Sequence, residues 1–465
     1  MIQIRNWEKL IENGETPRIR ESRAVALQCL ERGINAAEPK QLVKAKVKVE
    51  NNQLQVEGYS FDLGKFNHVY VVGGGKAGGK MAQSIEEILG VHVTAGAVNI
   101  PYGTREETHV IELYEASHPV PDEAGVKGTA RIVALAEQAD ENDLVICLIS
   151  GGGSSLMPLP REGISLKDKQ ALTNALLKCG ATITEINAVR KHLSAFKGGW
   201  LAKKAYPATV LNLVLSDVMG DPLDSIASGP TVPDSSTFND ARKVLEKYGL
   251  WGKAPVSIRQ IVLEGARGLL QETPKAGDLV FEKVHNVLIG NNRTASQAAF
   301  DCLRSRGVNT LLFAKMLEGE AREVGKALAN LSSEVCNAPF SKSLGAVAGG
   351  ETTVTVTGEG LGGRNQELAL SAALNLAESG ECVIASLSTD GVDGPTDAAG
   401  AIVDNSTVKR ARELGLDPEK YLQNNDSYSF FFQLGDLIFT GASGTNVNDI
   451  SVVVALKDKL NQNVN

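Results

Sequence analysis

Histidine and cysteine are both scarce in this chain, with six residues of each among 465. No two histidines have metal-ligand spacing, so a histidine–metal enzyme is not expected. The cysteines lie far apart, without the paired spacing of a disulfide framework or a zinc ribbon. They are Cys29, Cys147, Cys179, Cys302, Cys336 and Cys382. We therefore predict reduced cysteines and a cytoplasmic location.

Long apolar runs and an excess of positive charge are also missing. No run approaches the ~20 residues that a membrane helix needs, and residues 1–8 lack the pattern of a signal peptide. The formal net charge of −8 argues against binding to nucleic acid. We expect neither a membrane nor a nucleic-acid partner, although a local basic pocket can bind a small anion. The oligomeric state is open, and a homodimer is one option.

Glycine, in contrast, is abundant, with 47 residues that cluster after predicted strands. Strands and helices alternate along most of the chain, which predicts a parallel α/β sheet covered on both faces. The length favours two domains, placed at 1–240, with a Rossmann-like sheet, and 241–465. Either terminus could cross over to complete the other domain. The main predicted strands are 68–72, 93–100, 109–114, 144–149, 209–215, 284–289, 309–314, 345–357, 381–388 and 450–455, with helices in 1–37, 122–139, 166–179 and 182–196.

The first glycine loop, residues 73–81, partly matches two phosphate-binding motifs. It has the glycine spacing of a dinucleotide fingerprint, but the following strand lacks the acid that binds the ribose. It nearly fits a P-loop, but Met81 stands where Ser or Thr would hold magnesium. A helix N-terminus still attracts an anion, which Lys76 would meet. The loop predicts a phosphate site at Gly73, Gly74 and Gly75; a tight turn with a solvent-exposed lysine is the alternative.

The second glycine loop consists of Ser150, Gly151, Gly152, Gly153, Ser154 and Ser155. It would offer backbone N–H groups and hydroxyls to phosphate oxygens. A hydrolase nucleophile is the rival interpretation, but Leu156 replaces the closing glycine of the Gly-x-Ser-x-Gly pattern. A structural turn is the third alternative.

The third glycine loop, residues 358–363, follows a β-branched run at 352–357 and precedes Arg364. Such a loop can form an anion-binding nest, and an arginine at a helix start adds a planar fork for phosphate. We therefore predict phosphate contacts from Gly360, Gly362 and Gly363.

Other polar groups stand near these loops. Arg190, Ser194 and Lys197 have the i, i+4, i+7 spacing of one helix face, which could clamp a small carboxylate; a solvated basic face is the alternative. Asp217 follows the strand 209–215, where its carboxylate could hold magnesium or accept a hydroxyl proton. His118 lies in a proline-containing loop, where a structural anchor is the commoner role.

A last acidic group follows the predicted strand 381–388. Asp390, Asp393 and Asp397 lie within eight positions, which suits a hard cation. Turn chemistry alone also explains two Asp-Gly pairs.

The order of these segments resembles the glycerate 2-kinase family, whose C-terminal part is known as the MOFRL domain. The matching runs are 72–77, 118–122, 150–155, 190–194, 215–218, 228–231, 349–354, 363–367, 389–394 and 444–449. The resemblance implies a smaller C-terminal α/β domain, with a MOFRL segment at about 343–455, and an interdomain cleft where ATP and D-glycerate meet. It implies 2-phosphoglycerate as the product.

The resemblance also implies site residues. The family's active-site lysine, aspartate and arginine correspond to Lys76, Asp217 and Arg364. For Mg²⁺ we expect Asp217 with Glu351 or Asp390. For the substrate we expect contacts from His118, Arg190, Lys197 and Asn365. An NAD(P)-dependent hydroxypyruvate reductase is the main rival, weakened by the missing ribose acid, and a nonenzymatic sugar-acid sensor is a third class.

Overall fold

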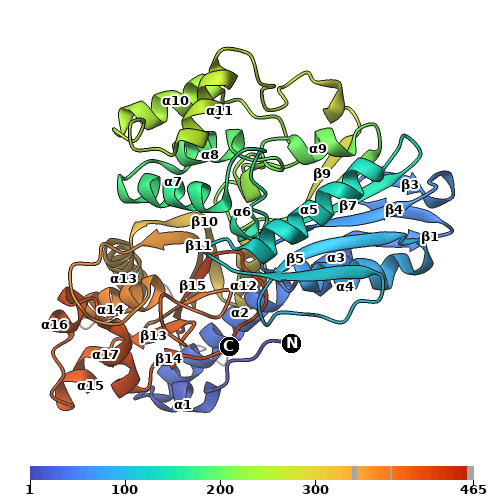
Figure 1. Cartoon of the computed structure of the whole chain (residues 1–465). Helices are drawn as coiled ribbons and strands as arrows, with labels where there is room; N and C mark the ends of the chain where they lie inside the picture. The colour runs from blue at the N-terminus through green and yellow to red at the C-terminus, as the bar shows by residue number, and fades with distance from the viewer. Residues whose placement is uncertain (338–342, 377–379, 458–465) are drawn as a thin grey trace. The chain divides into compact units, whose positions relative to one another are not determined.

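The computed structural model describes residues 1–337, 343–376 and 380–457, and Figure 1 shows their helices and strands. The chain forms two compact units. We call Pro39–Ile289 the central unit, and Met1–Glu38 with Gly290–Asn465 the terminal unit. Both have α/β architecture, as the sequence predicted. Their limits differ from the expected division near residue 240, because 241–289 pack in the central unit and the first 38 residues cross over.

A six-stranded sheet in the order β6-β5-β4-β7-β8-β9 forms the centre of the central unit. The ladders that join β6 to β8 are all parallel. The strand order reverses between β4 and β7, which makes the carboxyl ends of these two strands the usual ligand position of such a sheet. The Rossmann-like prediction is therefore confirmed. The strands are β4 (Val69–Gly74), β5 (Ala95–Pro101), β6 (Ile111–Ala116), β7 (Leu144–Ser150), β8 (Thr209–Leu215) and β9 (Val284–Gly290).

Helices cover both faces of this sheet. Strands β4 and β7 are buried along their whole length, which explains their continuous apolar sequences. Helix α4 (Gly78–Leu89) lies against the side chain of Val98, whereas Ile132 of α5 (Glu123–Gln138) packs in one core with the adjacent Ala97. Neighbouring residues of a strand point to opposite faces, so α4 and α5 cover opposite sides.

A second hydrophobic cluster joins four helices of the central unit. They are α7 (Leu166–Lys178), α8 (Ile183–His192), α10 (Phe238–Lys247) and α11 (Val256–Ala266). Because α10 packs on both α8 and α11, residues 241–289 stay with the first sheet rather than starting a new domain. The remaining elements are α3 (Pro39–Lys46), an antiparallel sheet of β1 (Val47–Glu50), β2 (Gln53–Val56) and β3 (Tyr59–Asp62), α6 (Gly153–Leu156) and α9 (Trp200–Ala205).

The terminal unit has a mixed six-stranded sheet in the order β10-β11-β15-β12-β13-β14. Strands β10 and β11 pair in parallel, whereas β15 pairs antiparallel with both β11 and β12. Strand direction therefore differs from the parallel expectation, because the last strand inserts between two earlier ones. The strands are β10 (Asn309–Glu320), β11 (Leu344–Thr353), β12 (Val383–Ser388), β13 (Gly400–Asp404), β14 (Leu437–Ile438) and β15 (Asp449–Ala455).

The N-terminal residues complete this second unit. Helix α2 (Pro17–Ala36) packs on α12 (Asn292–Ser305) and β15, and Figure 1 shows the blue helix among orange and red elements. Helices α13 (Ala321–Asn337) and α14 (Arg364–Leu376) share a core with Val453 of β15. The shorter helices are α1 (Trp7–Glu12), α15 (Thr407–Glu413), α16 (Pro418–Gln423) and α17 (Ser427–Leu434).

Two sequence expectations can be compared with this fold. The five cysteines whose side chains are described are thiols rather than disulfides, and the Cys336 side chain lies outside that set. Across 1–337, 343–376 and 380–457, none of the helices combines the length and apolar character needed to cross a bilayer.

Candidate functional site

The first two glycine loops lie side by side at the carboxyl ends of β4 and β7. Gly73 and Gly75 have φ angles of +140° and +145°. A Cβ on Gly73 would lie 2.0 Å from the Leu148 carbonyl oxygen, and one on Gly75 would lie 2.1 Å from Ser150 Oγ. Only glycine permits this combination of backbone angle and close approach. The glycines of the first loop thus bring β4 against β7.

The backbone donors of the first loop are used inside the protein. The N–H of Lys76 donates to the carbonyl oxygen of Gly151 at 2.7 Å. The N–H of Ala77 donates to Ser150 Oγ at 3.0 Å. These bonds fix the first loop to the second, so what the first loop can offer a ligand is chiefly the Lys76 side chain.

The second loop is different. Within the part of the chain that the structure describes, the N–H groups of Gly152, Gly153 and Ser154 have no protein acceptor. Gly152, with φ of +79°, precedes the short helix α6, whose first N–H groups need an acceptor from outside the helix. The Ser154 hydroxyl lies 2.8 Å from that of Ser228, and Ser155 Oγ donates to the Gly152 carbonyl oxygen at 3.0 Å. This loop can therefore bind an anion through its backbone.

Three predicted site residues contact this loop. A Cβ on Gly152 would lie 2.9 Å from the His118 ring and 3.2 Å from the Lys76 side chain. A Cβ on Gly151 would lie 2.0 Å from Asp217 Oδ2. Glycine at both positions thus lets the stem of a lysine side chain, an imidazole and a carboxylate approach one backbone segment. The structure brings together the lysine and aspartate that the sequence suggested.

A cavity of about 300 Å³ lies beside the loop. Its polar wall includes His118, Ser154, Ser155, Lys169, Arg190 and Lys197. Lys197 is fully buried, and its Nζ donates to the carbonyl oxygens of Ser154 and Met157 at 2.8 and 2.9 Å. Burial, together with the charges of Lys169 and Arg190, lowers the pKa of Lys197 well below its usual range.

Lys169 is a site residue that the sequence analysis missed. It is 7% exposed, and its Nζ donates to the Pro158 carbonyl oxygen at 3.0 Å. Burial and the charge of Arg190 lower the pKa of Lys169 to about 7. The signal was its place in an apolar stripe of α7, with Leu166 and Leu172 three residues away on either side.

The predicted helix face at 190–197 is not formed as expected. Helix α8 ends at His192, and Ser194 Oγ instead accepts the N–H groups of Phe196 and Lys197 in the following turn. Arg190 and Lys197 nevertheless line the same cavity. The turn, rather than helical spacing, places them there.

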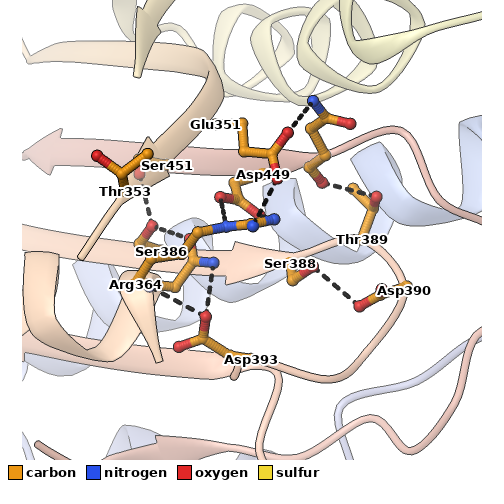
Figure 2. Close-up of polar contacts among 12 residues, drawn as sticks. Glu351, Thr353, Arg364, Ser386, Ser388, Thr389, Asp390, Asp393, Asp449 and Ser451 are labelled. Atoms are coloured by element: carbon orange, nitrogen blue, oxygen red, sulfur yellow. Dashed lines mark hydrogen bonds and ion pairs between the residues drawn. The ribbon is translucent and has the colours of Figure 1, made fainter. Parts of the chain in front are cut away.

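Arg364 in the terminal unit lies between two carboxylates (Figure 2). Its Nε and Nη2 donate to the two Asp449 oxygens at 2.6 and 3.0 Å, and Nη1 donates to Glu351 Oε1 at 2.6 Å. The other Glu351 oxygen accepts from Asn448 Nδ2 at 3.0 Å. Burial alone would lower the pKa of Arg364, but Asp449 and Glu351 outweigh it and raise the pKa. Both oxygens of Glu351 are thus in use.

The N–H groups of residues 358–361 in the third glycine loop donate to other groups of the protein. Those of Gly358 and Leu361 donate to the side chains of Asn425 and Asp426 at 3.0 and 3.1 Å, and that of Gly360 donates to the Asn424 carbonyl oxygen at 2.9 Å. Cβ atoms on Gly360, Gly362 and Gly363 would each lie within 2.3 Å of a neighbouring atom. These glycines serve close packing, and a phosphate bound by the Gly360 N–H would have to replace its hydrogen bond to Asn424.

Two further predicted residues are engaged in local structure. Asp390 Oδ1 accepts from Ser388 Oγ at 2.9 Å and from the N–H of Val392 at 3.1 Å, as Figure 2 shows for the serine. Asn365 is 1% exposed, and its side chain donates to Asp393 and accepts from Ser386. Among the residues described, no three His, Cys, Asp or Glu side chains are grouped to hold a metal ion.

Asp393 caps helix α14. Its two oxygens accept the N–H groups of Asn365 and Gln366 at 3.1 and 2.9 Å. Burial raises the pKa of Asp393, although these bonds oppose the effect. This second acid of the 390–397 group thus has a structural role, because it binds the helix start that carries Arg364.

Comparisons with known proteins agree along most of the chain. Residues 25–263 match a family described as a domain of unknown function, DUF4147, and residues 344–449 match the MOFRL family. The D-glycerate 2-kinase of Thermotoga maritima is 49% identical over 83% of this chain and 90% of its own length. The glycerate 2-kinase of Pyrococcus horikoshii is 44% identical over 93% and 97%. A crystal structure of glycerate kinase from Thermotoga maritima superposes with a TM-score of 0.83 at 43% identity, covering 97% of this chain and all of that one.

Proposed function

The chain belongs to the glycerate kinase family with a C-terminal MOFRL domain, and we propose that it transfers a phosphoryl group from ATP to the 2-hydroxyl of D-glycerate. The products are 2-phosphoglycerate and ADP. One observation carries the proposal: the Gly152–Ser154 backbone donors stand at the strand-order reversal, in contact with Lys76 and near Asp217. Phosphoryl transfer asks a protein mainly to position the phosphates and neutralise their charge.

The proposed roles follow from charge. Lys76 stabilises negative charge on the transferred group, while the N–H groups of the second loop hold phosphate oxygens. Arg364 of the terminal unit is the third proposed catalytic residue. His118, Arg190 and Lys197 are proposed to contact D-glycerate.

Asp217 is the residue that we propose for magnesium. Mg²⁺ usually binds through one or two carboxylates together with phosphate oxygens, so a carboxylate at a phosphate-binding loop fits its chemistry. The ion would neutralise charge on the phosphates. Asp217 can alternatively accept the proton of the substrate hydroxyl. Glu351 and Asp390 are secondary candidates, since each already accepts hydrogen bonds within the terminal unit.

The rival reductase needs an acid for the nicotinamide ribose at the end of β5. Asn99 occupies that region, and its side chain donates to the carbonyl oxygens of Gly125 and Leu156 at 3.0 and 2.7 Å. It therefore ties two loops together. We expect no oxidation of NADH or NADPH with hydroxypyruvate.

The product identifies the reaction. The protein is incubated with D-glycerate, ATP and magnesium, and enolase is added without phosphoglycerate mutase. An enolase signal means 2-phosphoglycerate. ADP release with a signal that needs the mutase means the 3-isomer and overturns the regiochemistry. No ADP, together with NADH consumption on hydroxypyruvate, supports the reductase.

The Lys76→Ala variant tests the proposed charge. We expect kcat to fall by at least ~100-fold, given the size of such electrostatic effects in phosphoryl transfer. Lys80→Ala is the matched control, because Lys80 follows in the first turn of α4 where a P-loop lysine would stand. Steady-state kinetics would contradict the assignment if Lys80→Ala lost turnover and Lys76→Ala kept it.

A further inference from the structure

Three cations line the cavity of the central unit without an acid to balance them. Within the described ranges, no carboxylate forms an ion pair with Lys169, Arg190 or Lys197. Their neighbour Lys191, also on α8, shows the usual arrangement. It is buried, and its Nζ lies 3.3 Å from the buried Asp234. The lack of an acidic partner is therefore a feature of the residues that line the cavity and not of helix α8 as a whole.

Burying positive charge without a counter-ion is unfavourable, so a protein that keeps such groups usually uses them. An anion in the cavity would supply the missing charge. Lys169, Arg190 and Lys197 all line the cavity, but the Lys197 ammonium already donates to two carbonyl oxygens, so it is the least available of the three. The first two are the groups most available to a ligand.

The rest of the wall indicates the kind of anion. Apolar contacts come from Val120, Leu166 and Leu177, and polar ones from Gln170 and Asn174. Gln170 donates through Nε2 to the Pro121 carbonyl oxygen at 2.6 Å, which turns its amide into a fixed part of the wall. A cavity of about 300 Å³ with few fixed polar groups is typical of a small-molecule site. Cations, amides and apolar surface together suit a small hydroxy acid.

We propose that Lys169, with Arg190, binds the carboxylate of the substrate and so selects a hydroxy acid over an uncharged polyol. This inference rests on the proposed function, and it adds the residues that bind the acid group of the substrate. Arg190 provides a permanent planar cation, and Lys169 provides a second charge from α7. Neutral glycerol would leave both cations unbalanced and bind weakly.

The site makes acid binding depend on pH. Lys169 faces Arg190 of α8, Lys197 of the following turn, the Pro158 carbonyl oxygen and the loop of His118. Its pKa of about 7 means that much of it is neutral above that pH. A bound carboxylate favours the charged form, so binding takes up a proton above pH 7. Affinity for the acid should be highest below pH 7 and fall as pH rises through it.

The Lys169→Gln variant provides the main test. We expect the KM for D-glycerate to rise at least ~10-fold, the size of a lost charge-assisted hydrogen bond. The KM for ATP and the thermal midpoint should stay close to those of the parent. Lys167→Gln is the matched control, since Lys167 is exposed in the same turn of α7. Lys169→Gln with unchanged glycerate KM would overturn the proposal.

A second measurement needs no variant. The KM for D-glycerate is followed from pH 6 to 9, and proton uptake on binding glycerate without ATP is measured by calorimetry in two buffers. A KM independent of pH, with no proton uptake, overturns the site even if the enzyme is an active kinase. Proton-linked glycerate binding, lost in Lys169→Gln, supports the site even if no phosphorylated product forms. The two proposals can therefore fail separately.

Discussion

In the terminal unit the buried guanidinium of Arg23 lies between two carboxylates, whereas in the central unit the buried ammonium of Lys169 has a carbonyl oxygen as its acceptor. Arg23 donates to Asp404 at 2.6 Å and to Asp436 at 2.8 Å, and all three side chains are fully buried. Lys169 donates to Pro158 at 3.0 Å. The first arrangement is complete within the protein, whereas for the second we propose that a ligand supplies the missing negative charge.

Arg364 lies between these two cases. Like Arg23, Arg364 pairs with two carboxylates, here those of Glu351 and Asp449. However, 29% of its side chain is exposed, so solvent or a ligand can reach it. A paired arginine can hold its fork in a fixed direction, because both sides of the guanidinium are constrained. Arg23 thus supports the fold, Lys169 is proposed to bind a ligand, and the geometry of Arg364 suits both roles.

The largest expected effect is on Arg23. Arg23→Leu leaves the buried Asp404 without its cation and the buried Asp436 with Arg410 alone, which should lower the free energy of unfolding by about 3–5 kcal/mol. Urea unfolding measures it, with Arg32→Leu on the exposed side of α2 as the control. A loss below 1 kcal/mol would contradict the contrast between Arg23 and Lys169, because the paired charges of Arg23 would then contribute little to the stability of the fold.

Arg364→Ala is expected to lower kcat by at least ~100-fold. It should also reduce stability, because Asp449 is 1% exposed and would lose its bidentate partner. Arg364→Lys keeps the charge but not the two parallel hydrogen bonds. Equal kcat in Arg364→Lys and the parent would show that charge alone matters. Full turnover in Arg364→Ala would remove Arg364 from the mechanism.

Much of the central unit could be predicted, because its strands are largely apolar runs and two of them, β4 and β7, lead into glycine loops. Strand β8 has the predicted limits, Thr209 and Leu215. The positions of Lys76 and Asp217 at strand ends also follow from the pattern, since parallel strands place their carboxyl ends at one edge. Local sequence was sufficient to locate these strands, whose neighbours in the sheet from β6 to β8 are all parallel.

The rest depended on partners that are distant in sequence. The three glycine loops look alike, but only the structure shows that segment 424–426 takes the donors of residues 358–361. Helix α2 joins the terminal unit because it packs on β15, near the other end of the chain. Lys169 was missed, because the lack of an acidic partner for it is visible only once α7 and α8 meet.

The smallest expected effect has the opposite sign to that of Arg23. Lys169→Met removes a buried charge and should raise the free energy of unfolding by about 1 kcal/mol at pH 7, less the cost of leaving the Pro158 carbonyl without its donor. The gain should shrink as pH rises from 7 towards 10. In that window the folded parent, with a Lys169 pKa of about 7, binds fewer protons than its unfolded state, so the parent gains stability with pH and the variant does not. Thermal unfolding at pH 7 and 9 measures both changes. A variant less stable than the parent at both values would mean that Lys169 supports the fold as Arg23 does, and the distinction between paired and unpaired cations would be lost.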